Sequence, residues 1–272
     1  MKKNSPLVSI ENVYFKYDSQ KWLLENINLE INHGDRIGII GDNGSGKSTL
    51  AKILTGIHCP KEGQVSLMGK PVSWILHYPE VAYIGDPGYE QDLLGLPYNL
   101  TVESLINIFL SFSTEINDKA VDIYNGLNIE NFKKTAVEHL SKGQRQKVMA
   151  MLALVKQPKL LIVDEPTEGM DSHCRSFFLH YIEQLIHKTN LSIIWISHRL
   201  DEIYKFSQTV YTLEEGKLKP DHAQYFDIIS QMDSGEKKHL KNLSPSAIFS
   251  VLGRTLADRS FQEHTFVIHR RA

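Results

Sequence analysis

A glycine-rich loop carries the clearest chemistry in this sequence. The stretch from Gly41 to Thr49 reads Gly-Asp-Asn-Gly-Ser-Gly-Lys-Ser-Thr and fits the pattern G-x-x-x-x-G-K-[S/T], which binds phosphate groups. Glycines let the backbone turn through angles that other residues resist, and this turn points several N–H groups into one concavity that suits an anion. Lys47 adds a positive charge, and the Ser48 hydroxyl can ligate Mg²⁺. The candidate phosphate-binding residues are Gly41, Asn43, Gly44, Ser45, Gly46, Lys47, Ser48 and Thr49.

A pair of carboxylates forms the second candidate site. The apolar run at residues 160–163 is followed by Asp164 and Glu165, a pattern that predicts a buried strand with acidic side chains at its C-terminal tip. Ligands of open α/β sheets bind at that edge. Asp164 can hold Mg²⁺, and Glu165 can act on a water molecule. The alternative is a strand that simply ends in a polar turn, which the phosphate loop in the same chain disfavours.

His198 and Tyr17 are two further candidates. His198 follows the predicted strand at residues 191–197, so we expect it at the same sheet edge as the carboxylates. A neutral histidine there can hydrogen-bond a γ-phosphate or the attacking water. Tyr17 follows the first predicted strand, and an exposed aromatic ring at that place can stack on a purine. Ordinary surface packing of Tyr17 is an equally good interpretation of the sequence alone.

Short apolar or alternating runs predict the elements that position these side chains. Residues 36–40 read as a strand before the phosphate loop and residues 47–55 as a helix after it, which is the context that the motif requires. Alternating residues at 8–17 and 24–31 predict a small antiparallel sheet ahead of the loop. Other strands are expected at 64–68, 81–84, 191–197 and 210–213, and helices through most of 101–150 and at 176–188.

Composition excludes several classes of protein. The chain has 272 residues, of which 42% are hydrophobic, enough for a large core in one or two domains. Its net charge of −2, from 30 basic and 32 acidic residues, gives no overall basic field toward nucleic acid or anionic membrane. Two cysteines are too few for a disulfide framework, which indicates a reducing compartment. The sequence shows no signal peptide and no apolar run near the ~18 residues that span a bilayer.

The character of the chain changes after Pro220. Residues 233–238 are polar and turn-like and predict a linker. Ser244 and Pro245 favour the start of a helix, expected over residues 246–257, and residues 265–268 predict a terminal strand. We interpret residues 221–272 as a small appendage that either packs on the core or mediates dimerisation or regulation.

Together the motifs resemble those of the ATP-binding cassette (ABC) ATPases, specifically a stand-alone ATP-binding subunit of an ABC transporter. The resemblance covers nearly all of residues 8–218. Leu140-Ser141-Lys142-Gly143-Gln144 resembles the family signature, which is the most specific of the motifs. The phosphate loop is similar to Walker A, and the carboxylate pair is similar to the Walker B aspartate and the catalytic glutamate. Tyr17 resembles the A-loop aromatic residue that stacks on adenine. Asp171 resembles the D-loop aspartate, and His198 resembles the switch histidine.

This resemblance implies the fold and the domain boundaries. It implies an α/β fold with a P-loop NTPase (RecA-like) core, an N-terminal antiparallel β subdomain and an inserted α-helical subdomain. Residues 1–220 would form the ATPase domain, with the helical subdomain at about 87–150, and residues 221–272 the appendage of unknown role.

Two positions depart from the family pattern. Lys142 replaces the first of the two glycines usual in the signature, while Ser141 and Gly143 remain to contact phosphate. Asp86 stands where the family's Q-loop glutamine follows a strand. An aspartate there can reach Mg²⁺, which adds Asp86 to the candidate metal ligands Ser48 and Asp164, although its side chain is shorter than glutamine and negatively charged.

The resemblance also implies a mechanism and partners. Two copies sandwich two ATP molecules head to tail, and each ATP meets the phosphate loop of one copy and Ser141, Gly143 and Gln144 of the other. ATP and Mg²⁺ are the implied cofactors, and the implied catalytic residues are Glu165, His198 and Lys47. The implied partners are integral membrane transporter subunits and a second ATP-binding subunit, in a homodimer or heterodimer, without nucleic acid. The implied location is cytoplasmic, peripheral on the cytoplasmic face of the cell membrane.

Two alternatives stay open on the sequence. One is a soluble ABC ATPase that acts on a protein or nucleic-acid assembly without transport. The other is a module that binds ATP but barely hydrolyses it.

Overall fold

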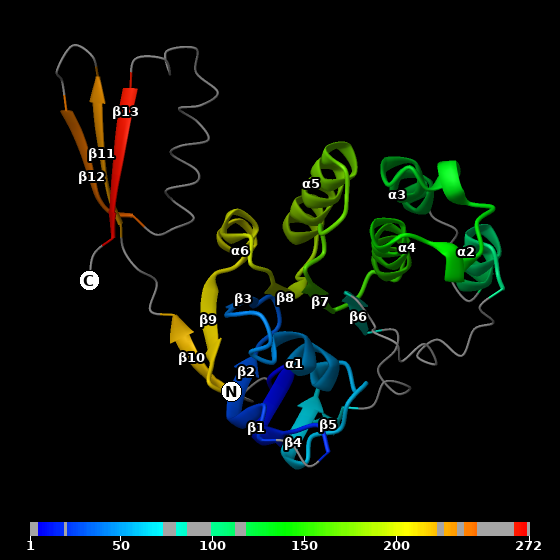
Figure 1. The fold of residues 1–272 in the computed structure, drawn as a ribbon, viewed down its shortest axis with the longest axis horizontal. Coiled ribbons are helices and arrows are strands. Elements are labelled where there is room, and N and C mark those ends of the chain that lie inside the picture. Colours follow the sequence, from blue (N-terminus) through cyan, green and yellow to red (C-terminus); the bar gives the residue numbers. More distant parts are fainter. Residues whose placement is uncertain are drawn as a thin grey trace.

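A six-stranded sheet forms the centre of the protein (Figure 1). The computed structural model describes residues 5–18, 21–72, 80–85, 99–111, 118–221, 226–232, 237–243 and 264–270. The strands of this sheet are β3 Arg36–Ile40, β6 Val81–Ile84, β7 Leu160–Asp164, β8 Ser192–Ile196, β9 Thr209–Glu214 and β10 Lys217–Asp221. Their order is β10-β9-β3-β8-β7-β6, and all neighbours are parallel except the β9–β10 hairpin. The parallel order brings the C-terminal ends of β3, β8 and β7 to one edge, as the sequence predicted.

A second, antiparallel sheet is built mainly from the N-terminal part of the chain. Its strands are β1 Val8–Phe15, β2 Leu24–Ile31, β4 Glu62–Leu67 and β5 Lys70–Pro71, in the order β2-β1-β4-β5. In β2 the apolar residues Leu24, Ile27, Leu29 and Ile31 are buried and the polar ones between them are largely exposed. Such alternation is expected for a sheet with one face on the core and one in water.

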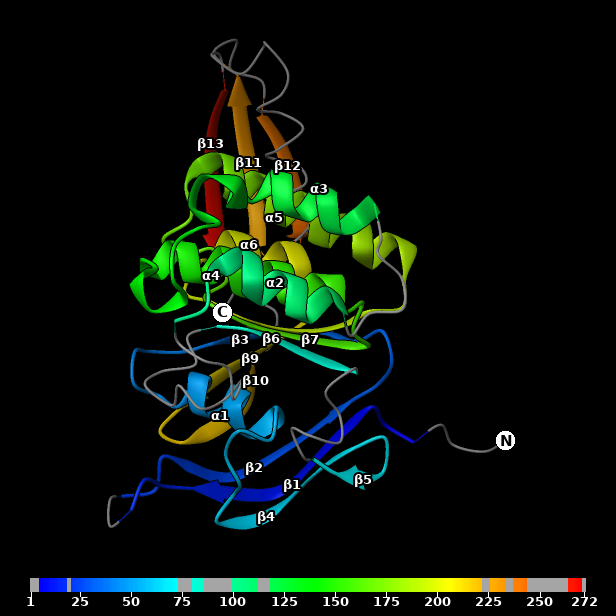
Figure 2. The same ribbon diagram turned by 90° about the vertical axis from the view of Figure 1, so that its right-hand side faces the viewer.

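The helices lie on both faces of the central sheet. Helix α1 Lys47–Leu54 lies between the two sheets, whereas the remaining helices cover the opposite face (Figure 2). Those helices are α2 Val102–Ser111, α3 Asp118–Gly126, α4 Lys142–Val155, α5 Ser172–Lys188 and α6 Leu200–Phe206, with 3₁₀ turns η2 Ile129–Phe132 and η3 Val137–His139. This layered α/β arrangement with a phosphate loop confirms the predicted fold class.

Two apolar clusters fix the central sheet from its two sides. On the side of α5 and α6, the Trp195 ring stacks on Phe206 at a centroid distance of 4.5 Å and lies 6.3 Å from Phe178. On the side of α1, Ile194 and Ile196 belong to the other cluster. Successive side chains of a strand point to opposite faces, so β8 takes part in both cores and is held firmly where it ends.

The C-terminal part of the chain forms a third sheet of three strands. These strands are β11 Phe226–Met232, β12 Lys237–Leu243 and β13 His264–Arg270, with β11 in the middle and both pairings antiparallel. The predicted terminal strand is confirmed by β13. The predicted linker is wrong at residues 237–238, which begin β12, because this lysine-rich strand lacks the apolar alternation that marks a strand in sequence. The helix expected at residues 246–257 lies outside the described residues.

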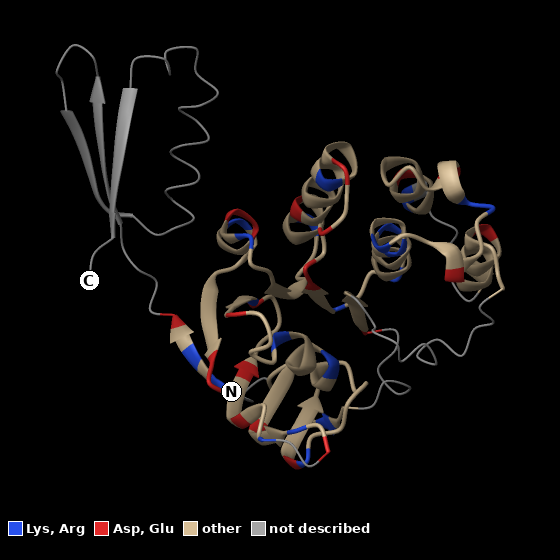
Figure 3. Cartoon of the chain, in the orientation of Figure 1, with Lys and Arg blue, Asp and Glu red and all other residues tan. Residues whose placement is uncertain are grey.

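Charge and helix length add two observations on the surface. Figure 3 shows acidic and basic residues interspersed over the described elements rather than gathered on one of them. Within the described ranges, no helix combines the length and the apolar character needed to cross a membrane.

Candidate functional site

The phosphate loop connects β3 to α1. Gly41, Gly44 and Gly46 have φ angles of 150°, 81° and 104°, which only glycine adopts without strain. A side chain at Gly41 would also collide with the backbone carbonyl oxygen of Leu213. The glycines predicted from the sequence are therefore required by the backbone path itself.

Lys47 is folded over this loop. Its Nζ atom donates to the carbonyl oxygens of Gly41 at 2.8 Å and Asp42 at 2.7 Å, and the residue is buried. The Ser45 Oγ atom is buried without a hydrogen-bond partner among the described residues. An ammonium group and an unsatisfied hydroxyl at the start of a helix fit a phosphate group, whose oxygens accept hydrogen bonds from both.

Asp164 lies at the end of β7, beside the phosphate loop. The pKa of Asp164 is raised above its ordinary value, mainly because the carboxyl group is buried. A hydrogen bond from the Ser48 hydroxyl lowers this pKa, the charge of Glu165 raises it, and the charge of Lys47 lowers it. A buried carboxylate next to a hydroxyl gives two oxygen ligands of the kind that Mg²⁺ prefers. Asp86, the third predicted ligand, lies outside the described residues.

Replacing Asp164 with asparagine is expected to stabilise the protein in the absence of nucleotide. Because the pKa of Asp164 is higher in the folded chain than its ordinary 3.8, ionisation disfavours folding, and stability is lost as the pH rises through the raised pKa. At neutral pH, Asp164→Asn removes this unfavourable charge. We expect the melting temperature to rise by about 2–4 °C, the shift that about 1 kcal/mol gives in a domain of this size.

Thermal melts of the two proteins between pH 4 and pH 8 test this expectation. The difference should shrink as the pH falls through the raised pKa, where folded Asp164 takes up a proton, and it should be lost below the ordinary value of 3.8. Asp122→Asn, which removes an exposed carboxylate from α3, is the control and should leave the melting temperature unchanged. A melting temperature that is lower for Asp164→Asn at neutral pH would contradict the argument.

Glu165 and His198 are held together at the same edge of the sheet. The Oε1 atom of Glu165 accepts from both the backbone N–H and the Nδ1 atom of His198, each at 2.8 Å, and its Oε2 atom accepts from the Ser197 hydroxyl at 2.9 Å. Since a carboxylate can only accept, Nδ1 carries the proton, and Nε2 of His198 is left for another partner. The pair thus joins the ends of β7 and β8.

The backbone at Glu165 is strained. Its φ angle is 47°, a conformation that is uncommon outside glycine and is often found at functional sites. The strain is held by two hydrogen bonds: the Glu165 N–H donates to Ile196 O at 2.9 Å, and Gln146 Nε2 donates to Glu165 O at 3.3 Å. This conformation fixes the direction in which the carboxylate leaves the strand.

The signature segment begins helix α4. Ser141 caps the helix, because its hydroxyl accepts from the Gln144 N–H at 3.2 Å while the Gln144 side chain accepts from the Ser141 N–H at 3.0 Å. Gly143 lies against Gly169, so a side chain at Gly143 would collide with the Gly169 carbonyl oxygen. Lys142, in place of the usual glycine, forms an ion pair with Glu168 at 2.8 Å. In the described part of the chain, no hydrogen bond joins Ser141, Gly143 or Gln144 to the phosphate loop.

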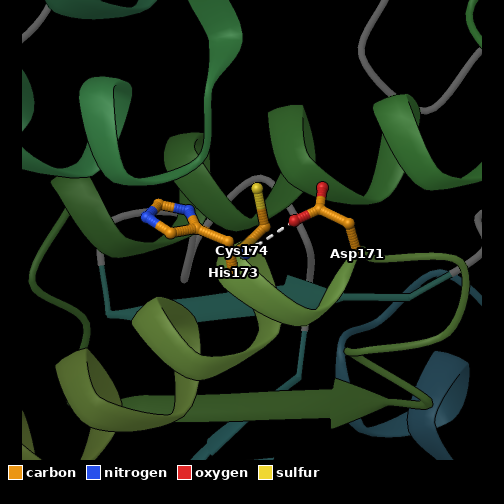
Figure 4. Close-up of side chains that lie close together, drawn as sticks. All are labelled: Asp171, His173 and Cys174. Atoms are coloured by element: carbon orange, nitrogen blue, oxygen red, sulfur yellow. Dashed lines mark hydrogen bonds between the residues drawn. The ribbon is translucent and has the colours of Figure 1, made fainter.

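Asp171 caps the next helix, α5. Its Oδ1 atom accepts from the Cys174 N–H at 2.9 Å and its Oδ2 atom binds Lys147 Nζ at 2.7 Å, and these contacts hold the pKa of Asp171 well below its usual range. Figure 4 shows Asp171, His173 and Cys174 close together, a grouping that resembles a metal site. The Lys147 ammonium group, which also bonds to Cys174, already supplies the positive charge at this place. The grouping is therefore a helix cap held by an ion pair.

Tyr17 lies over the start of α1. Its hydroxyl shares hydrogen bonds with Thr49 Oγ1 at 3.0 Å and His58 Nε2 at 3.4 Å, and its ring is packed edge-on against Phe15 and His58. Tyr17 as a whole is 40% exposed, which leaves surface for a stacking partner. The structure thus places Tyr17 next to the phosphate loop, 32 residues away in sequence from Thr49.

Sequence reasoning missed several residues of this site. Ser197 and Gln146 hold Glu165, and Lys147 holds Asp171. Ser197 could have been found, because it directly follows the apolar run of β8 at the predicted edge. Gln146 and Lys147 gave no signal of their own, since they lie in α4 and reach the site only through tertiary packing.

Comparison with known sequences shows which family the chain resembles. A family model described as ABC transporter matches residues 24–168. A Bacillus cereus protein named as an ABC transporter ATP-binding protein is 29% identical over 256 residues, which cover 92% of this chain but 44% of that protein. A Chlorella vulgaris protein named as a sulfate/thiosulfate import ATP-binding protein is 30% identical over 216 residues, covering 78% of this chain and 89% of that protein. The chain therefore spans less than half of the Bacillus cereus relative.

Solved structures show similarity over most of the chain. A bacterial Atm1-family ABC exporter with ATP bound superimposes with a TM-score of 0.64 and 26% identity, covering 80% of this chain and 39% of the exporter. CbiO1 from Clostridium perfringens, part of the ABC transporter complex CbiONQ, gives a TM-score of 0.60 at 21% identity, covering 93% of this chain and 94% of that one. At such identity the second similarity concerns the fold alone.

Proposed function

The chain belongs to the ABC transporter family, and we propose that it is the subunit that binds and hydrolyses ATP to drive such a transporter. The observation that carries this proposal is the convergence at one sheet edge of the phosphate loop, the buried carboxylate Asp164 and the Glu165–His198 pair. Binding alone would not require the strained, hydrogen-bonded Glu165. Its geometry supports ATP hydrolysis over a module that only holds ATP.

The residues divide the reaction between them. The loop N–H groups and Lys47 bind the phosphates of ATP, and the Tyr17 ring stacks on the adenine. Glu165 orients the attacking water and accepts its proton, while Nε2 of His198, which is an acceptor because Nδ1 carries the proton, accepts a hydrogen bond from that water. Asp164 and Ser48 would hold Mg²⁺, which neutralises phosphate charge when it is bound. Lys47 acts by stabilising the charge that develops on the transferred phosphoryl group.

A second copy, or a related subunit, completes each site. The signature offers Ser141, Gly143 and Gln144 at the N-terminus of α4, where backbone N–H groups and the helix dipole favour an anion. In the proposed assembly these residues contact the ATP that is bound to the other copy. ATP thus joins the two copies, and its hydrolysis lets them separate.

The motion of the two copies would be passed to membrane subunits. We place the chain on the cytoplasmic face of the cell membrane, bound to integral membrane subunits through which the substrate passes, and we expect no nucleic-acid partner. The ATPase domain would comprise residues 1–220, and the sheet of β11, β12 and β13 would belong to the appendage.

Purification of the tagged chain from membranes tests the proposal. We expect an integral membrane protein to co-purify, and the complex to bind Mg-ATP and release phosphate. A preparation that neither binds nor hydrolyses Mg-ATP, alone or with its membrane partner, would overturn the proposed function. ATP hydrolysis without any membrane protein would instead favour a soluble ATPase of the same family.

A further inference from the structure

Glu202 carries the most deeply buried charge in the described part of the chain. It lies in helix α6, its exposed fraction is 1%, and the next most buried residues of the acidic and basic types, Asp164 and Lys47, reach 7% and 9%. Burying a carboxylate is costly unless hydrogen-bond donors surround it. A carboxylate at such a place therefore requires an explanation.

Three side chains converge on one oxygen of this carboxylate. The Oε1 atom accepts from Thr167 Oγ1 at 2.6 Å and Arg175 Nε at 3.0 Å, and Arg199 Nε lies 3.5 Å away. The Oε2 atom is buried without a partner among the described residues. If the carboxylate served only to stabilise the fold, we would expect both of its oxygens to be hydrogen-bonded. Because only Oε1 is bonded, we infer that the position of Oε1 matters.

The donors come from the segments that carry the proposed catalytic residues. Thr167 is two residues beyond Glu165, and Arg199 directly follows His198. Arg175 lies in the first turn of α5, just after the Asp171 cap. Glu202 thus joins the chain after β7, the chain after β8 and the start of α5.

A second link between the first two segments is the Glu165–His198 pair itself. Oε1 of Glu165 accepts twice from His198, and Oε2 accepts from Ser197. These contacts use three of the roughly four acceptor positions of the carboxylate, so one position on Oε2 is left for the attacking water. The Glu202 link lies outside the pair, so it can stay in place while that water binds.

We propose that Glu202 is a positioning residue for hydrolysis, which keeps His198 in place relative to Glu165 by tying the segment after β8 to Thr167. This inference rests on the proposed ATPase function. It adds a residue that touches neither ATP nor water and acts through the Thr167 and Arg199 contacts.

The test compares Glu202→Ala with Glu202→Gln in the full chain. Glu202→Ala removes both oxygens, and we expect the turnover number to fall at least about tenfold while the KM for Mg-ATP changes less than about threefold. Glu202→Gln keeps a carbonyl oxygen that can accept from Thr167 and places its NH₂ group at the unpaired side. We expect it to recover a large part of the lost turnover.

A control removes a carboxylate that joins the same two helices at the surface. Glu183 in α5 forms an ion pair with Lys205 in α6 at 3.1 Å, and both side chains are more than 40% exposed. Glu183→Ala should leave turnover unchanged, because exposed ion pairs contribute little. If Glu183→Ala lowered turnover as much as Glu202→Ala, any loosening of α5 and α6 would explain the effect and the proposal would fail.

A double-mutant cycle separates positioning from general damage. If Glu202 acts through His198, Glu202→Ala should lower turnover in the wild type but have little further effect in a His198→Ala background. The same fold reduction in both backgrounds would overturn the proposal, as would wild-type turnover of Glu202→Ala. Should Glu202→Ala fail to fold, Thr167→Val takes its place in the cycle with the same two outcomes. If the wild-type protein does not hydrolyse ATP, the proposed function itself is wrong. This result is distinct from the outcomes of the cycle, which compares variants with an active wild type.

Discussion

Replacing Glu165 with glutamine is expected to lower ATP turnover about a hundredfold or more while ATP binding is kept, because a general base contributes about 10² to 10⁴ in rate. Glutamine has nearly the same shape, and its carbonyl oxygen can still accept from His198, as Oε1 of Glu165 does at 2.8 Å. Its amide cannot take up a proton from water. Phosphate release at saturating Mg-ATP and nucleotide binding by calorimetry measure the two effects separately.

A dimer that persists is the second expected property of Glu165→Gln. Because ATP would not be cleaved, the two copies should stay joined, and size-exclusion chromatography in Mg-ATP should show a dimer that the wild type forms only briefly. Glu214→Gln, which neutralises an exposed carboxylate in the β9–β10 hairpin, should behave as the wild type. Turnover of Glu165→Gln at the wild-type rate would show that Glu165 is not the base.

Replacing Lys47 with alanine is expected to weaken ATP binding about tenfold to a hundredfold. Hydrogen bonds to charged groups are worth about 1.5–3 kcal/mol each, and about 1.4 kcal/mol corresponds to a factor of ten in affinity. Nζ donates to the carbonyl oxygens of Gly41 and Asp42, so the ammonium group lies beside the place where phosphate should bind. Titration of wild type and variant with Mg-ATP measures the change.

Lys52→Ala is the matched control for this variant. Lys52 lies in the last turn of the same helix, α1, away from the phosphate loop, and its loss should leave ATP affinity unchanged. Thermal melting of both variants without nucleotide shows whether Lys47→Ala has altered the loop rather than the affinity. Full ATP affinity of a folded Lys47→Ala protein would contradict the assignment of the phosphate loop.

The central part of the fold could be predicted from the sequence because its signals are local. The bounds of strand β3 and the first residue of α1 were predicted correctly, because an apolar run, a glycine-rich loop and a helix follow one another directly in the sequence. The three glycines of the loop have the positive φ angles that such a loop needs. The prediction that Asp164, Glu165 and His198 share one edge followed from the parallel order of strands alone, and the hydrogen bond between Glu165 and His198 confirms that two of them meet.

Other parts could not be predicted because they depend on contacts between distant residues. Thr167 and Arg175 reach Glu202 across 35 and 27 residues, and neither the threonine nor the arginine has an unusual sequence context. The strands β11 and β12 were not predicted. In β12 the reason is that the strand is rich in lysine and lacks the alternation of apolar and polar residues that marks a strand. The position of Tyr17 beside the phosphate loop could not be predicted either, because its contact with Thr49 joins residues 32 apart in the sequence.

The contact between Gly143 and Gly169 bears on the timing of the two reactions in a dimer. One segment belongs to the signature, which in the proposed assembly senses the neighbour's ATP, and the other follows the chain's own Glu165 by four residues. With no side chain between them, the two backbones are closely packed, so a movement of one segment would displace the other. Hydrolysis of one ATP would therefore alter the binding of the other ATP. The two hydrolysis reactions in such a dimer would then depend on each other.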